Sequence, residues 1–273
     1  MIAERPTAER PNAERPTAER LTAAGIGLAH GFFTRRGGVS QGPWASLNGS
    51  LSGSDDPGHV AENRARVAGV LGVAPASLLG LTQIHGDVVA TVTGPWAVGA
   101  GPRADAMVTR VGGLALGVIT ADCAPVLFAD TQAGVIGAAH AGWRGAASGV
   151  LEATLAAMAA LGAAAHRIVA VVGPCIAQPS YEVGGDMVAE LGRLGPAPEA
   201  FLAPGTRPGH WQFDLPGYCL ARLRAAGVGR VGQVEADTAA DAERFFSHRR
   251  RTLAGGGPIG HQVSAIVLPA GPR

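Results

Sequence analysis

The sequence predicts one mixed domain, of α/β or α+β type, within its 273 residues. Short apolar segments of strand length follow one another along the chain, interspersed with helical patterns. Hydrophobic residues make up 47% of the chain, which is enough for a sizeable core. No linker interrupts the chain after residue 22, and a chain of this length lies within the range of a single large domain.

The first 22 residues are expected to form a disordered tail. Residues 3–22 read AERPT, AERPN, AERPT and AERLT, a five-residue repeat with balanced Glu and Arg and almost nothing to bury. A segment of this composition cannot offset the entropy lost on ordering. We therefore place the domain at residues 23–273 and expect the folded part to begin near Leu21.

Apolar patterning predicts the elements of the first half of the domain. A strand at 28–34 leads into the turn RRGGVSQGP. Asp56 followed by Pro57 is typical of a helix start, because aspartate caps free N–H groups and proline fits the first helical position. A helix is therefore expected over 59–72. The strands that follow are expected at 78–85, 87–92, 104–109, 114–120, 125–130 and 134–140.

The second half is predicted to be richer in helices. The segment 148–161 is apolar on nearly all sides, which is typical of a buried helix. Residues 245–250 (FFSHRR) are expected to form a short strand or a turn. The other elements are buried strands at 168–173 and 264–268 and helices near 185–193 and 214–226.

Charge and composition exclude several classes of function. The net charge is +1, so the chain lacks the basic surface of a nucleic-acid-binding protein. It has no long apolar segment that would span a membrane and no polybasic cluster that would bind one. All 22 basic residues are Arg. The absence of Lys excludes a Schiff-base lysine, a pyridoxal phosphate anchor and a P-loop.

The cysteines indicate a reducing compartment. Cys123, Cys175 and Cys219 include no CxxC pair, so a disulfide scaffold is not expected. The charged N-terminal repeat does not have the pattern of a signal peptide. We therefore expect a cytoplasmic protein, and the sequence does not indicate its oligomeric state.

Three residues form a candidate metal site. His85, Cys123 and His140 each lie at or near the end of a predicted buried strand, where ligand sites of such sheets usually lie. Two imidazoles and one thiolate are suitable ligands for zinc. Three protein ligands leave a fourth position open, as in catalytic zinc sites. Alternatively, Cys123 is a nucleophile with His140 as its base.

Other polar residues have two interpretations each. Asp122 either orients a histidine or caps its turn. Arg35 and Arg36, in the glycine-containing loop TRRGGVS, either bind a phosphate or carboxylate through their guanidinium groups or form a solvated turn. Asn48 is a candidate polar contact for a substrate in the same region.

Eight motifs occur in an order that resembles the laccase-domain family, whose bacterial members are also called peptidoglycan editing factors or polyphenol oxidase-like proteins. The resemblance covers about residues 30–268. The motifs read FFTRRGGVSxGPWASLN, DxPxxVAENR, QIHG, ADAMVT, TADCAPVLF, AAHAGWRG, GPCIxxxxYEV and FFSHRR.

The resemblance implies an α+β fold with four α/β/β/α layers and mixed sheets. It implies a zinc site formed by His85, Cys123 and His140, with Arg35 in the active site. It further implies phosphorolysis of purine nucleosides (adenosine, inosine, guanosine and methylthioadenosine), together with deamination of adenosine. We accordingly expect catalytic roles for Arg35, Cys123 and His85, and substrate contacts from Arg35 and Asn48.

Two alternatives to a zinc phosphorylase remain. One is a copper-dependent polyphenol oxidase, which older family names suggest. The chain has only four Met and no His-x-His pair, which is poor in the ligands that such copper sites use. The other is a Cys123-dependent hydrolase that edits peptidoglycan precursors.

One departure from the family pattern is His261, which stands where the closing TGRQ motif usually has Arg.

Overall fold

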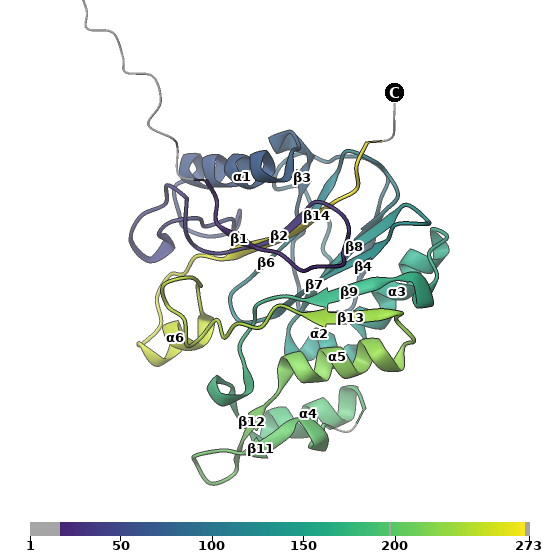
Figure 1. Cartoon of the computed structure of the whole chain (residues 1–273). Helices are drawn as coiled ribbons and strands as arrows, with labels where there is room; N and C mark the ends of the chain where they lie inside the picture. The colour runs from purple at the N-terminus through teal and green to yellow at the C-terminus, as the bar shows by residue number, and fades with distance from the viewer. Residues whose placement is uncertain (1–16, 197, 271–273) are drawn as a thin grey trace, which may run out of the picture.

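The computed structural model describes residues 17–196 and 198–270 and has two β-sheets packed face to face between helical layers (Figure 1). The first sheet has the order β1-β2-β14-β6-β3. The second has the order β13-β9-β7-β8-β5-β4. Both combine parallel and antiparallel pairs, so the predicted single α+β domain with mixed sheets is confirmed.

The strands of the first sheet are β1 (Arg20–Leu21), β2 (His30–Phe33), β14 (Gln262–Val267), β6 (Ala115–Thr120) and β3 (Leu78–Leu79). Those of the second are β13 (Arg230–Gln233), β9 (Val169–Val172), β7 (Ala124–Asp130), β8 (Val135–Ala141), β5 (Ala106–Thr109) and β4 (Val89–Val92). A third, small sheet has the order β10-β12-β11 and consists of Glu182–Gly184, His210–Phe213 and Leu202–Pro204.

Helices cover the two outer faces of the sandwich. Figure 1 shows α1 above the first sheet and α5 below the second. Helix α3 packs against β8, β5 and β4 of the second sheet. The helix bounds are α1 Pro57–Leu71, α2 Trp143–Ser148, α3 Val150–Ala160, α4 Gly185–Leu194, α5 Leu215–Ala225 and α6 His248–Leu253. The described residues therefore have the expected order of layers, α/β/β/α, with the small sheet and α4 at the lower end.

Alternation along β7 explains why the second sheet is buried on both faces. Successive side chains of a strand point to opposite faces. Val126 and Phe128 pack in the cluster that includes α3 and α5, whereas Leu127 and Ala129 pack between the two sheets. The strand is therefore apolar throughout, as a doubly covered strand must be.

The helix expected at 59–72 is confirmed with a small change of bounds. Asp56 caps α1 by accepting hydrogen bonds from the backbone N–H groups of Gly58 and His59. Gly72 ends the helix with a positive φ of 74°, which glycine adopts without steric cost. The helices near 185–193 and 214–226 are likewise present, as α4 and α5.

Three local expectations were wrong. Residues 17–22 were assigned to the disordered tail, but Arg20–Leu21 forms β1, which pairs with β2 and contributes to the sheet edge. Residues 1–16 lie outside the described part. The strand at 78–85 is only two residues long, and the segment 245–250 leads into α6. The helix expected at 148–161 is present as α3, and Gly149, with a φ of 104°, separates it from α2.

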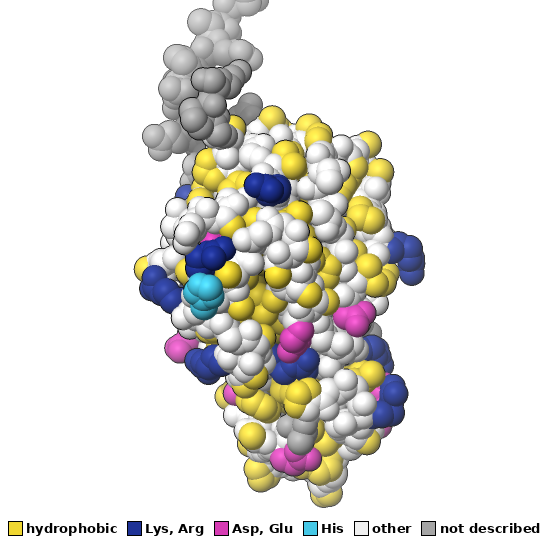
Figure 2. Space-filling view, turned by 90° about the vertical axis from the view of Figure 1, so that its right-hand side faces the viewer, with side chains coloured by type: hydrophobic (Ala, Val, Ile, Leu, Met, Phe, Trp, Pro, Cys, Tyr) yellow, Lys and Arg dark blue, Asp and Glu magenta, His cyan; other side chains and the backbone are white. Residues whose placement is uncertain are grey.

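The surface agrees with the charge composition. On the face that Figure 2 presents, Arg and acidic side chains are scattered in small groups and form no continuous basic band. Among the helices of the described residues, none is both long and apolar enough to cross a bilayer.

The close approach of the two sheets gives a stability prediction. A Cβ at Gly173 would lie 2.1 Å from Cδ1 of Phe32, which is 1% exposed and cannot move aside. We expect Gly173→Ala to lower the free energy of unfolding by roughly 1–3 kcal/mol in a urea titration. Gly69→Ala is the matched control, because nothing lies within 4 Å of that exposed helical position. It should raise the free energy of unfolding by about 0.5–1 kcal/mol. Equal changes in the two variants would contradict the close contact between Gly173 and Phe32.

Candidate metal centre

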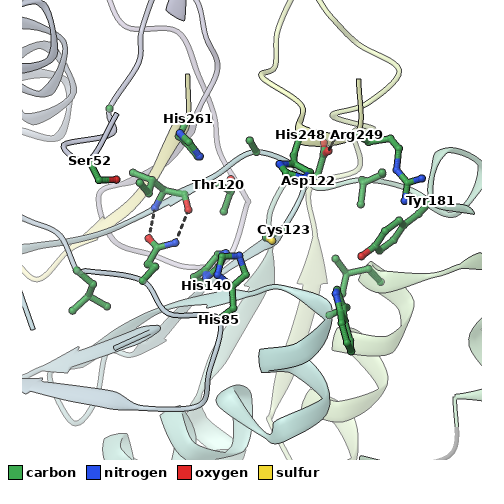
Figure 3. Close-up of a pocket in the computed structure, with 18 of the residues that line it drawn as sticks. Ser52, His85, Thr120, Asp122, Cys123, His140, Tyr181, His248, Arg249 and His261 are labelled. Carbon is green, nitrogen blue, oxygen red and sulfur yellow. Dashed lines mark hydrogen bonds between the residues drawn. The ribbon is translucent and has the colours of Figure 1, made fainter. Parts of the chain in front are cut away.

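One large cavity, of about 910 Å³, contains the three predicted metal ligands in its wall. His85 comes from the loop after β3, Cys123 from the turn between β6 and β7, and His140 from β8. The C-terminal segment around α6, the small sheet and the loops at 49–52, 80–83 and 99–101 also contribute to the wall. Figure 3 shows the residues around the three ligands. Segments far apart in the sequence thus meet at one point.

The three side chains lie close enough to share one ion. Their ligand atoms all lie within 4.8 Å of one another. The ring centroids of His85 and His140 are 4.8 Å apart and the rings are nearly perpendicular, at 87°. Two imidazole nitrogens and one sulfur are a donor set that zinc or copper accepts. The residues present therefore fit a bound metal ion.

The carboxylate of Asp105 fixes both histidines. Asp105 precedes β5 and is fully buried. Its Oδ1 accepts hydrogen bonds from His140 Nδ1 and from the backbone N–H of His85, both at 2.9 Å. Its Oδ2 accepts one from the backbone N–H of Gly86 at 2.7 Å. Because Nδ1 of His140 is occupied, Nε2 is the atom left to bind a metal.

Gln83 holds the loop that carries His85 against the first sheet. Its side-chain amide donates to the carbonyl of Ile119 at 2.8 Å and accepts from the N–H of the same residue at 2.9 Å. The side chain thereby replaces the strand pairing that ends at Leu79. His85 itself has a φ of 60°, a conformation that non-glycine residues rarely adopt outside functional sites.

Asp122 joins the Cys123 turn to the C-terminal segment. It has a φ of 92° and accepts hydrogen bonds from the hydroxyls of Thr238 and Ser247 and from the backbone N–H of Arg249, the last at 2.6 Å. No histidine is among these partners. Of the two interpretations of Asp122, the structure supports the one in which it holds a turn.

The electrostatics of the site favour a thiolate. Burial alone would raise the pKa of Cys123, but the charge of His140 and hydrogen bonds from His140 and His85 outweigh it, and the pKa is lowered. Burial opposes protonation of His140, but the adjacent Cys123 sulfur and Asp105 carboxylate raise its pKa. The thiolate is the form of cysteine that binds metals and acts as a nucleophile.

Arg35 and Asn48 do not lie beside these three residues. The guanidinium of Arg35 donates to the carbonyls of Ala45 and Ala242 and lies 4.5 Å from the centre of the Phe246 ring. Asn48 is fully buried and accepts a hydrogen bond from the backbone N–H of His261. Within the described part of the chain, neither lines the cavity. Their contacts with a substrate therefore stay predictions.

Several cavity residues were not identified from the sequence. Asp105 lies in the motif ADAMVT, and its role follows only from the pairing of β5 with β8, which places it opposite His140. A carboxylate partner is common for a metal-binding histidine, so an aspartate at a strand start was the available signal. Tyr181, Arg249 and Thr120 line the cavity; all three lie in motifs of the family resemblance, but the sequence assigned none of them a role.

The chain is thus a two-sheet α+β domain with a His-Cys-His group suited to metal binding in one large cavity. Residues 29–269 match the family model described as "Multi-copper polyphenol oxidoreductase laccase". The chain belongs to this family, as the resemblance implied.

Relatives and solved structures of similar length agree. A protein of Deinococcus radiodurans named purine nucleoside phosphorylase is 42% identical over 249 residues, covering 90% of this chain and 92% of that protein. One of Streptomyces coelicolor with the same activity name is 43% identical, covering 83% and 92%. The crystal structure of YlmD from Geobacillus stearothermophilus has 31% identity and a TM-score of 0.84, covering 94% and 98%. Neisseria meningitidis NMB0706 has 36% identity and a TM-score of 0.79, covering 93% and 98%.

Replacing Asp105 tests whether it organises the centre. Asp105→Asn removes the negative charge of the carboxylate that accepts hydrogen bonds from His140 and His85. We therefore expect metal affinity to fall roughly 10–100-fold in a chelator competition. Asp130→Asn is the control, because Asp130 is similarly buried but pairs with Arg167 at the end of β7 that lies away from Cys123. Equal metal affinity in both variants would contradict the role of Asp105.

The lowered pKa of Cys123 predicts its reactivity in the metal-free protein. The thiolate reacts with iodoacetamide, and a group with a lowered pKa remains ionised as the pH falls. Between pH 8.5 and pH 7, alkylation of an ordinary cysteine slows about tenfold, whereas that of Cys123 should hardly change. Cys175 and Cys219 are buried, which raises the pKa of each thiol, and should stay unmodified. Mass spectrometry of the modified peptides gives the three rates, and an ordinary decline at Cys123 would contradict the assignment.

Proposed function

We propose that this chain is a zinc-dependent purine nucleoside phosphorylase that cleaves adenosine, inosine, guanosine and methylthioadenosine with phosphate. The proposal rests on the position of His85, Cys123 and His140, which lie together in the wall of one cavity of about 910 Å³. This volume accommodates a nucleoside together with phosphate. Relatives at 42–43% identity that bear the name purine nucleoside phosphorylase support the same activity.

The reaction exchanges one bond at the ribose. An oxygen of hydrogen phosphate forms a bond to the anomeric carbon as the bond from that carbon to the purine nitrogen breaks. The electron pair of the broken bond goes to the purine, and the proton that hydrogen phosphate carried ends on the purine. The products are ribose 1-phosphate and the free base. No oxidant or reductant is needed.

The residues of the site supply binding and orientation. His85, Cys123 and His140 would hold the zinc ion, with Asp105 fixing the ring of His140. A zinc ion with three protein ligands supplies a Lewis acid and an open position for an oxygen ligand.

Deamination of adenosine is proposed as a second reaction of the same centre. Water attacks C6 of the purine, the amino group leaves as ammonia, and inosine remains. The open position of a three-ligand zinc site is suited to activating that water. This reaction needs no phosphate, so the product mixture distinguishes the two activities.

The family description favours a different reaction, oxidation of phenols by several copper ions. Among the described residues, His85, Cys123 and His140 form one group that could hold a metal. One such group does not provide for several copper ions. A metal-free hydrolase based on the Cys123 thiolate would need no metal at all, so a chelator separates it from the zinc enzyme.

Replacing His85 tests the proposal. We expect purified protein to contain about one zinc per chain and to form adenine from adenosine only when phosphate is present. His85→Ala removes one of three donors and should lose the metal and lower phosphorolysis at least 100-fold. His166→Ala, at an exposed position outside the cavity, is the control. Inosine formed without phosphate would reveal the deaminase alone. Full activity of His85→Ala, or activity that survives a chelator, would contradict the zinc assignment.

A further inference from the structure

Phosphate is a dianion, and a site for it needs a cationic donor that is not already neutralised. Three arginines line the cavity: Arg64, Arg207 and Arg249. They differ in what their guanidinium groups already bind. That difference identifies the one that is free for a substrate.

The guanidinium groups of two of the three arginines already bind other groups of the protein. Arg64 is buried and donates to the carbonyls of Leu78 at 2.8 Å and Gly49 at 3.3 Å, so it holds two loops together. Arg207 is paired with the carboxylate of Glu182 at 2.6 Å.

The guanidinium of Arg249 differs from these two. Its guanidinium makes no hydrogen bond or ion pair to any described residue and lies 5.4 Å from the centre of the Tyr181 ring. Its backbone N–H is bound to Asp122, the residue before Cys123. The carboxylate of Asp122 already accepts from the hydroxyls of Thr238 and Ser247 as well. Arg249 is thus anchored next to the metal ligands while its charged end stays free.

Tyr181 supplies a second donor at the same place. Burial raises the pKa of Tyr181 well above its usual range, so its hydroxyl keeps its proton at neutral pH. In Figure 3 the ring lies below Arg249, with its oxygen turned toward the side of Cys123. A guanidinium and a phenol that converge beside a metal centre form a suitable pair of donors for a phosphate group.

On the opposite side of the centre, the Arg64 guanidinium is already bound to two carbonyls. Thr120 and His261 line the cavity there (Figure 3). Burial lowers the pKa of His261 to about 4, so its ring is neutral at physiological pH. The buried Thr120 Oγ1 and His261 Nδ1 have no hydrogen-bond partner among the described residues. Neutral polar groups suit the hydroxyls and ring nitrogens of a nucleoside better than they suit a dianion.

We propose that Arg249 and Tyr181 form the phosphate subsite, so that phosphate binds on the α6 side of Cys123 and the nucleoside on the Thr120–His261 side. The inference rests on the proposed phosphorolysis and deepens it, because it assigns the phosphate to Arg249 and not to Arg35. Arg35 is held by two carbonyls and lies outside the cavity wall.

Steady-state kinetics of zinc-loaded Arg249→Gln test the subsite. Loss of one charge-assisted contact should raise the KM for phosphate roughly 10- to 100-fold, with the KM for the nucleoside and the zinc content unchanged. Arg249→Lys should recover part of the loss, since it keeps the charge. Arg207→Gln is the matched control, because it removes a paired arginine from the same cavity. Tyr181→Phe should raise the KM for phosphate about 5-fold and serves if Arg249→Gln fails to fold.

Calorimetric titration of the holoenzyme with inorganic phosphate gives a readout without turnover. Binding that is present in the wild type and lost in Arg249→Gln would support the subsite, even if no nucleoside is cleaved and the proposed function fails. An unchanged KM for phosphate in Arg249→Gln, with the loss found in Arg35→Gln, would overturn the inference and leave phosphorolysis standing. A wild type that neither binds phosphate nor cleaves nucleosides would overturn both.

Discussion

A buried carboxylate at the start of β5 is the interaction on which the metal centre depends. A fully buried charge is costly unless donors surround it, and Asp105 is surrounded by the His140 ring and by backbone N–H groups of residues 84–86. The same bonds that stabilise the charge therefore fix two of the three ligands. The pairing of β5 with β8 places the carboxylate opposite His140. Sheet register thus determines the geometry of the centre.

The remaining wall of the cavity comes from the end of the chain. Asp122 binds Ser247 and Arg249, and Asn48 binds the backbone of His261. Both acceptors are buried and have several partners. Their hydrogen bonds, and not strand pairing, therefore hold residues 247–261 against the metal-binding residues. The cavity wall therefore differs on its two sides, with a free guanidinium near α6 and a neutral imidazole near β14. Two substrates, one anionic and one neutral, would therefore bind on different sides of the metal centre.

Patterns along the chain predicted the large elements because these depend on burial. Strands such as 125–130 and 134–140 are continuous apolar runs, and α1 has its own capping residues. The donor triplet was also predicted, since His and Cys at strand ends are few. The role of Asp105 was not, because it depends on which strands pair. The positions of Arg35 and Asn48 were not predicted either, because Arg35 binds the carbonyl of Ala242 and Asn48 binds the N–H of His261, groups that only the folded chain brings near.

The small sheet and β1 were missed for a related reason. The strands β10, β11 and β12 have three or four residues each, and β1 has two. Segments so short have little periodicity of their own and form only against a neighbouring strand. They nevertheless matter for the site, because β10 follows Tyr181 directly.

X-ray diffraction from crystals of the zinc-loaded protein, recorded above and below the zinc absorption edge, shows whether His85, Cys123 and His140 hold the zinc ion. We expect one strong anomalous peak at bonding distance from His85 Nε or Nδ, Cys123 Sγ and His140 Nε2, with Asp105 still bound to His140 Nδ1. A peak that lies away from these three atoms, or no peak in protein that retains full nucleoside turnover, would contradict this assignment.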